Sequence, residues 1–184
     1  MLSKKAALTA VVLVALAAIC AVVVLRERSS YNTSRTVVVV AVDTAKLDVL
    51  SISLADDDTV INIERMSNRW FATTSHGNVA VRDEIVSELL AAISSVEAER
   101  LMTNSESQWS QYGVGAAGGS RVLARGNGRV LADFYCGSVD FDASTRQIWT
   151  YVRSDSETAV YKTDGYLNLA ITRCVEACKR LMHN

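Results

Sequence analysis

A glycine-rich segment carries the letters of a dinucleotide-binding motif. Gly113, Gly115 and Gly118 follow the pattern Gly-x-Gly-x-x-Gly, and Asp133 stands where an acidic residue would bind ribose. Nucleotide binding needs a strand before these glycines and a helix after them, because the helix N-terminus holds the pyrophosphate. Here residues 109–112 read as helical, and a strand pattern follows the glycines directly. The segment is therefore predicted to be a flexible loop, and no cofactor is expected.

Acidic residues gather in two predicted turns. Asp140, Asp142 and Ser144 resemble the start of a calcium-binding loop, but threonine and tyrosine stand where that loop requires glycine and glutamate. Three consecutive aspartates over residues 56–58 could bind a cation weakly, although charged residues are common at hairpin tips. Both segments are predicted to be solvated turns, and no metal site is expected.

The cysteines could bind zinc or form a disulfide. Cys174, Cys178 and His183 lie in one C-terminal segment, but a structural zinc site uses four closely spaced ligands. Both of these cysteines fall on the apolar stripe of a predicted helix, and Cys136 falls on the apolar face of a predicted strand. All three are therefore expected in the core. A disulfide between Cys136 and the last helix stays open if the compartment is oxidising.

The histidines give no support for nucleophilic catalysis. His76 precedes Gly77 in a predicted loop, His183 lies beside the C-terminus, and neither accompanies a Gly-x-Ser-x-Gly motif. Carboxylates are scattered along the chain, and no pair stands out as a general acid and base. We therefore predict no catalytic residues, and a hydrolase that uses carboxylates is kept as the alternative.

Aromatic residues in the second half of the chain could form a binding surface. Alternation along the predicted strands places Tyr135 opposite Cys136 and puts Trp149 and Tyr151 on one face, with Tyr161 on the next strand. An aromatic sheet face can bind a peptide, a glycan or a partner protein. The alternative is that a helix covers this face.

Hydrophobic periodicity predicts an α+β domain of antiparallel meanders packed with two main helices, arranged as two similar β–α halves. One helix has an apolar stripe from Ile85 to Val96, and the other covers residues 166–181. A brief helix is predicted over residues 105–112. The predicted strands cover residues 36–42, 49–55, 59–65, 69–74, 99–102, 121–125, 129–136, 146–153 and 159–162. The pairs Ser67-Asn68 and Asn127-Gly128 predict tight turns.

An apolar run over residues 6–25 follows Lys4 and Lys5 and ends at Arg26. Twenty residues of helix span about 30 Å, which matches the hydrocarbon core of a bilayer. The run lacks a polar cleavage region, so an uncleaved signal anchor is predicted, with the following domain outside the cytoplasm. The expected organisation is an anchor over 1–28, a tether over 29–36 and an extracytoplasmic domain over 37–184.

Composition limits the classes of partner. The chain has 184 residues with 19 lysines and arginines against 20 aspartates and glutamates, which gives a formal charge of −1. About 150 residues remain after the anchor, which is enough for one domain. Without a basic patch, nucleic acid is not an expected partner.

Several short motifs, taken in order, carry a family resemblance. They are Glu64-Arg65-x4-Trp70, the helix segment 86–93, Gln111-Tyr112-Gly113-Val114, Phe134-Tyr135-Cys136-Gly137, Tyr151-Val152-Arg153 and Ala159-Val160-Tyr161-Lys162. In these motifs the chain resembles an uncharacterised bacterial domain family found beside gliding-motility-type ABC transporters, where it is an auxiliary component. The proline usual soon after the Tyr-Gly motif is absent. The resemblance implies no catalytic residues.

The sequence thus predicts a single-pass protein of the bacterial inner membrane that contacts the bilayer through residues 6–25. The expected function is that of a non-enzymatic accessory or binding domain. The resemblance implies a permease or ATPase of an ABC-type transporter, or another envelope protein, as its partner. A free-standing ligand-binding envelope protein is the alternative without a transporter.

Overall fold

The computed structural model describes residues 37–54, 57–75 and 77–182. The predicted anchor over residues 6–25 and the tether over 29–36 lie outside these residues. Among the residues described, no helix combines the length and the apolar character that crossing a membrane requires.

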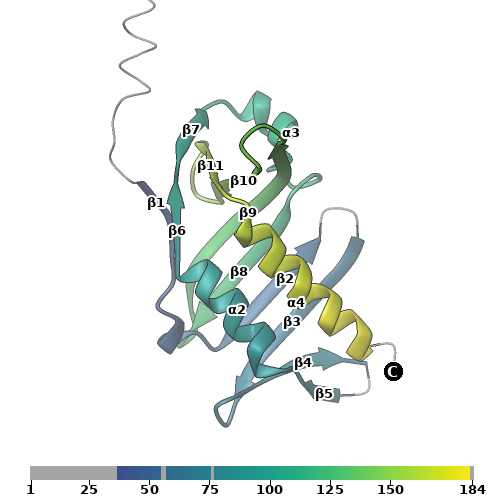
Figure 1. Cartoon of the computed structure of the whole chain (residues 1–184). Helices are drawn as coiled ribbons and strands as arrows, with labels where there is room; N and C mark the ends of the chain where they lie inside the picture. Colours follow the sequence, from purple (N-terminus) through teal and green to yellow (C-terminus); the bar gives the residue numbers. More distant parts are fainter. Residues whose placement is uncertain (1–36, 55–56, 76, 183–184) are drawn as a thin grey trace, which may run out of the picture. The chain divides into compact units, whose positions relative to one another are not determined.

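Nine strands of the described chain form one antiparallel sheet (Figure 1). Their order across the sheet is β5-β4-β3-β2-β8-β9-β10-β11-β7. The strands are β2 (Val49–Leu54), β3 (Asp57–Met66), β4 (Arg69–Thr74), β5 (Gly77–Ala80), β7 (Arg100–Thr103), β8 (Ser120–Gly126), β9 (Arg129–Asp142), β10 (Gln147–Ser154) and β11 (Val160–Asp164). Two further strands, β1 (Val37–Ala41) and β6 (Ser95–Ala98), pair with each other.

The large sheet contains two four-stranded meanders that meet at β2 and β8, which pair antiparallel. Helix α2 (Asp83–Ser94) follows the first meander, and helix α4 (Tyr166–Met182) follows the second. The two helices contact each other and lie on one face of the sheet (Figure 1). The predicted α+β class is therefore confirmed for the domain, and the order of its elements repeats in two β–α halves.

Two hairpins turn through residue pairs with a left-handed backbone. The φ angles are 49° and 66° at Ser67 and Asn68, and 52° and 72° at Asn127 and Gly128. Positive φ at both central residues is typical of the turn whose twist matches that of the flanking strands. These turns connect β3 to β4 and β8 to β9, so both predicted tight turns are confirmed.

The main core lies between the two helices and the sheet. Strands contribute alternate residues and helices contribute residues at a spacing of three or four, as their periods require. Fully buried members of this core include Leu50, Ile52, Ile61, Ile63, Val86, Leu89, Ile93, Phe134, Cys174 and Cys178. The expected burial of the three cysteines is confirmed, since Cys136 is buried in the same cluster.

The end of the first main helix differs from the prediction. Val96 continues the apolar stripe of the helix, but α2 ends at Ser94 and Ser95 has an extended backbone. Val96 instead pairs with Val40 of β1, and both side chains are buried. The stripe extends beyond the helix because Val96 enters the same core from a strand.

Two strands of the first meander also differ from the prediction. Strand β5 has no counterpart in the prediction, and β3 already begins at Asp57, inside the predicted aspartate turn.

Candidate functional site

Tyr135, Trp149 and Tyr151 lie on the sheet face opposite α4. Cys136, on the other face of β9, contacts Asn168 of α4 with 3.8 Å between Sγ and Nδ2. Tyr135 and Tyr151 belong to a second buried cluster, and Trp149 packs against it. The expected common face of these three aromatic residues is therefore confirmed.

Tyr161 does not share this face. In the pairing of β10 with β11, Tyr161 lies opposite Val152, whereas Lys162 lies opposite Tyr151. Successive residues of a strand point to opposite faces, so the register brings Lys162 to the aromatic side in place of Tyr161. The Lys162 ammonium is 3.2 Å from the centre of the Trp149 ring.

A covering segment over residues 105–119 packs on the aromatic face. It contains a short turn of 3₁₀ helix (Glu106–Gln108), helix α3 (Trp109–Tyr112) and the glycine-rich motif. The ring centres of Tyr112 and Tyr151 are 4.9 Å apart. Tyr135 and Tyr151 are only 7% and 9% exposed. Tyr135 and Tyr151 are therefore covered, as in the alternative in which a helix covers the aromatic face. Trp149 is half-buried and lies at the edge of this face, which we call the rim.

Glycines allow the covering segment to approach the sheet closely. A Cβ on Gly137 of β9 would lie 2.2 Å from the carbonyl oxygen of Tyr112. Gly113 ends α3 with a left-handed φ of 64°, and a Cβ there would lie 2.6 Å from Oγ of Ser138. Because a helix precedes these glycines and β8 follows them, the arrangement for pyrophosphate binding is missing, as predicted. Gly113 and Gly119 are buried, so the segment is more closely packed than the predicted flexible loop.

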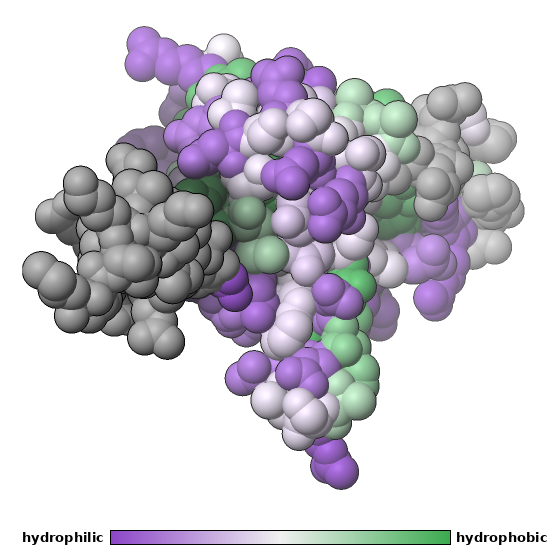
Figure 2. All heavy atoms as spheres, turned by 90° about the horizontal axis from the view of Figure 1, so that it is seen from above, coloured by the Kyte–Doolittle hydropathy of each residue, from purple (hydrophilic) through white to green (hydrophobic). Residues whose placement is uncertain are grey.

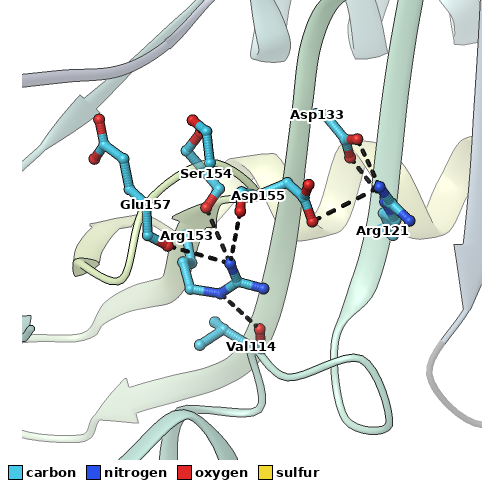
Figure 3. A network of polar contacts seen from close by, with 8 residues as sticks. Val114, Arg121, Asp133, Arg153, Ser154, Asp155 and Glu157 are labelled. Atoms are coloured by element: carbon cyan, nitrogen blue, oxygen red, sulfur yellow. Dashed lines mark hydrogen bonds and ion pairs between the residues drawn. The ribbon is translucent and has the colours of Figure 1, made fainter. Parts of the chain in front are cut away.

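Arg153 holds the covering segment to the sheet (Figure 3). Its side chain comes from β10 and the residue is 4% exposed. The guanidinium carbon is 3.8 Å from the ring centre of Trp109 and 4.4 Å from that of Tyr135. The guanidinium donates to four carbonyl oxygens, those of Val114 at 3.1 Å, Ser154 at 3.1 Å, Asp155 at 3.4 Å and Glu157 at 3.2 Å.

A second arginine lies beside this centre on the same face. Arg121 of β8 forms two hydrogen bonds to the Asp133 carboxylate, at 2.8 and 2.6 Å, and approaches Asp155 at 3.7 Å (Figure 3). Its guanidinium carbon is 5.6 Å from the ring centre of Tyr135. The hydrogen bonds to Asp133 raise the pKa of Arg121 above its usual range. Sequence reasoning missed both arginines. The sequence signal for Arg153 was a charged residue two positions after Tyr151 within a strand pattern, and Arg121 has no aromatic residue near it in the sequence.

At the rim of the aromatic face, charged groups surround Trp149. The Lys162 ammonium also lies 3.6 Å from the Glu99 carboxylate. The Tyr151 hydroxyl donates to Asp140 at 2.9 Å. Burial, and then this carboxylate, raise the pKa of Tyr151, so its phenol stays protonated at neutral pH. The rim therefore offers an aromatic ring, a cation and two acids for binding, without an activated phenolate.

Other predicted features are turns or core residues. Asp140 and Asp142 belong to the end of β9, so the turn begins later than predicted, after Asp142. Asp142 accepts hydrogen bonds from the backbone N–H of Ser144 at 2.7 Å and from its hydroxyl at 2.6 Å. Within the part of the chain that the structure describes, no group of three or more acidic, cysteine or histidine residues could hold a metal ion.

A cleft of about 340 Å³ lies between the α2–β6 segment and the start of α4, lined in part by Glu97 and Asp164.

The described cysteines are free thiols. Burial raises the pKa of Cys136 to about 11, partly offset by hydrogen bonds with Thr150 and Asn168. The hydrogen bond with Cys178, followed by burial, raises the pKa of Cys174.

Native Cys136 is expected to resist alkylation by iodoacetamide at about pH 8, since only a small fraction is thiolate and the group is buried. Unfolding returns its pKa toward 9.0, so the free energy of unfolding should decrease as pH rises between these two pKa values. Peptide mass spectrometry with and without urea measures the modification. Equal rates of labelling in the native and unfolded protein would contradict the burial of this thiol.

The fold and the site define a small antiparallel α+β domain with a face closed by an arginine-centred segment. The chain belongs to a family described as a domain of unknown function (DUF4340), whose model matches residues 70–176. The matched residues run from β4 into α4. No curated protein and no solved structure shows a significant match. The resemblance to an uncharacterised domain family is therefore confirmed, whereas its association with transporters stays a prediction.

Proposed function

We propose that this domain is a non-enzymatic binding module, anchored in the bacterial inner membrane, that serves an ABC-type transporter or another envelope complex from the extracytoplasmic side. The observation that carries the proposal is the rim of the aromatic face, where the half-buried Trp149 is bordered by Lys162 and Glu99. Aromatic rings with charged neighbours are common anchors at protein interfaces.

The surroundings of Trp149 support binding rather than chemistry at this rim. Lys162 is engaged by the indole ring and by Glu99, and the Tyr151 phenol is engaged by Asp140. Groups held in this way are fixed in orientation, which lowers the entropy lost when a partner binds. The covering segment and Arg153 keep the strands beneath the rim in one arrangement.

The transporter assignment rests on the family resemblance, and the membrane assignment on the apolar run over residues 6–25. A partner in the same membrane would meet a tethered domain at a high effective concentration. A modest contact area around one aromatic residue would therefore be sufficient for an auxiliary subunit.

Photocrosslinking from position 149 in the full-length protein tests this function. We expect a crosslinker at Trp149 to capture a permease or ATPase in native membranes, identified by mass spectrometry. Trp149→Ala should reduce co-purification of that component in mild detergent by about tenfold, which corresponds to about 1.4 kcal/mol.

Tyr161→Ala is the matched control, because it removes an aromatic residue from the opposite face of the neighbouring strand. Its co-purification should stay near that of the unmodified protein. Recovery of no transporter component with either method would refute the accessory-subunit function. A free-standing ligand-binding protein, or the hydrolase alternative, would then become the leading hypothesis.

A further inference from the structure

The hairpin of β9 and β10 exposes three large hydrophobic side chains, which we name the hairpin patch. Val139, Phe141 and Ile148 are 50%, 58% and 53% exposed. Phe141 pairs directly with Ile148, and Val139 pairs with Thr150. Cross-strand partners, and residues two apart along a strand, point to the same face, so the three side chains lie together.

The hairpin patch continues the face that forms the main core. Along β10, Ile148 lies on the same side as Val152, which is fully buried in that core. Helix α4 covers this face only from Tyr166 onward, and the backbone N–H of Gly165 donates to the carbonyl of Ile148 at 3.0 Å. The patch therefore extends the apolar face past the point where the helix begins.

Other large hydrophobic side chains are also exposed, Val38, Val60 and Val130 among them, and Phe141 is the most exposed of those described, at 58%. Figure 2 shows hydrophilic residues over much of the face that it views, with hydrophobic residues between them in separate groups. Half-exposed Phe and Ile side chains on paired residues favour burial, since transfer of apolar surface out of water stabilises by about 25 cal/mol per Å².

The size of the patch favours a membrane over a second copy of the chain. Three half-exposed side chains offer on the order of 300 Å², well below the roughly 800 Å² per partner of a stable protein interface. The hairpin carries Asp140, Asp142 and Arg146, so its charge does not favour anionic headgroups. Its apolar residues would contribute through insertion at the boundary of headgroups and acyl chains.

The segment between the apolar run and β1 is long enough for the hairpin to reach the boundary of headgroups and acyl chains. The apolar run ends at residue 25 and β1 begins at Val37, so roughly eleven residues connect them and span at most about 40 Å. Strand β1 contacts both β9 and β10. The tether is therefore long enough for the hairpin to touch the bilayer surface.

We propose that the β9–β10 hairpin inserts Val139, Phe141 and Ile148 into the interfacial layer of the membrane that anchors the chain. The inference rests on the membrane anchor of the proposed function. Contact at this second point would restrict the rotation of the domain about its tether. The rim around Trp149 would then be held in a defined orientation toward a partner in the same membrane.

The test uses the full-length protein, carrying Cys20→Ala, in phosphatidylcholine vesicles. A fluorophore is attached at Ala143→Cys in the hairpin turn or, as the matched control, at Val130→Cys at the other end of β9, where the side chain is 57% exposed. We expect nitroxide-labelled lipids to quench position 143 at least about twofold more strongly than position 130, because the hairpin enters the interface. Phe141→Ser with Ile148→Ser should abolish this difference, whereas Val130→Ser should leave the quenching at position 143 unchanged.

Extraction with alkaline carbonate separates the two proposals. If the protein stays in the vesicles but position 143 is as accessible to aqueous iodide as position 130, the hairpin insertion is refuted and the anchor stands. If carbonate releases the protein, the anchor is refuted and the insertion with it. Shielding of position 143 that increases with protein density, without quenching by lipid, would identify a second copy as the occupant and also refute insertion.

Discussion

Replacing Arg153 with alanine is expected to lower the free energy of unfolding by about 3–5 kcal/mol. The substitution removes a guanidinium from between two aromatic rings, those of Trp109 and Tyr135, and leaves buried carbonyl oxygens such as that of Val114 without their donor. It should also loosen the covering segment. Urea unfolding of the full-length protein in detergent, followed by tryptophan fluorescence, measures the change.

Arg125→Ala provides the matched control, because Arg125 lies on β8 of the same sheet and is exposed. Its effect should stay within about 0.5 kcal/mol, as for most surface substitutions. Hydrogen exchange should show faster exchange over residues 105–119 in Arg153→Ala alone. If both variants unfold at the same urea concentration as the unmodified protein, Arg153 does not hold the covering segment.

Gly137→Ala is expected to have a comparable effect, with a loss of about 2–4 kcal/mol. The added Cβ would lie 2.2 Å from the Tyr112 carbonyl oxygen and 2.7 Å from a methyl group of Val114, so the covering segment must move away from β9. This movement would separate the Tyr112 and Tyr151 rings and expose Tyr151 to solvent. Thermal unfolding and the near-ultraviolet circular dichroism of the aromatic residues measure the two consequences.

Gly115→Ala is the control within the same segment. A Cβ at Gly115 would have no atom within 4 Å, and its φ is not in the left-handed region. Alanine there reduces the freedom of the unfolded chain, so it should leave stability unchanged or raise it by up to about 1 kcal/mol. Equal destabilisation by both substitutions would mean that loss of loop flexibility, and not the close approach at Gly137, causes the effect.

Local patterns predicted most of the fold. The period of two along β2 and β3 and the period of three to four along α2 and α4 identify the elements and their buried faces, because side-chain direction is fixed by backbone geometry within each element. The turn at Asn127-Gly128 was predictable for a related reason, since few residue pairs tolerate two positive φ angles. Each of these signals depends on residues that are neighbours in the chain.

The candidate site was predictable only in part. Alternation placed Tyr135, Trp149 and Tyr151 on one face, but it could not reveal that residues 105–119 cover two of them. It also assigned Tyr161 to the wrong face, because the pairing of β10 with β11 determines which residue of β11 meets Tyr151. A register is a relation between two strands, and an error of one residue reverses the face of every side chain.

Contacts between distant parts of the chain determine the remaining features. Arg153 binds the Val114 carbonyl and stacks on Trp109, and Val96 leaves the helical pattern because β1 offers it a partner in Val40. The amino-acid sequence fixes which residues are apolar, charged or flexible and how they repeat. The packing of remote segments then selects which polar groups are buried together, because a buried guanidinium is stable only where carbonyl oxygens and aromatic rings converge on it.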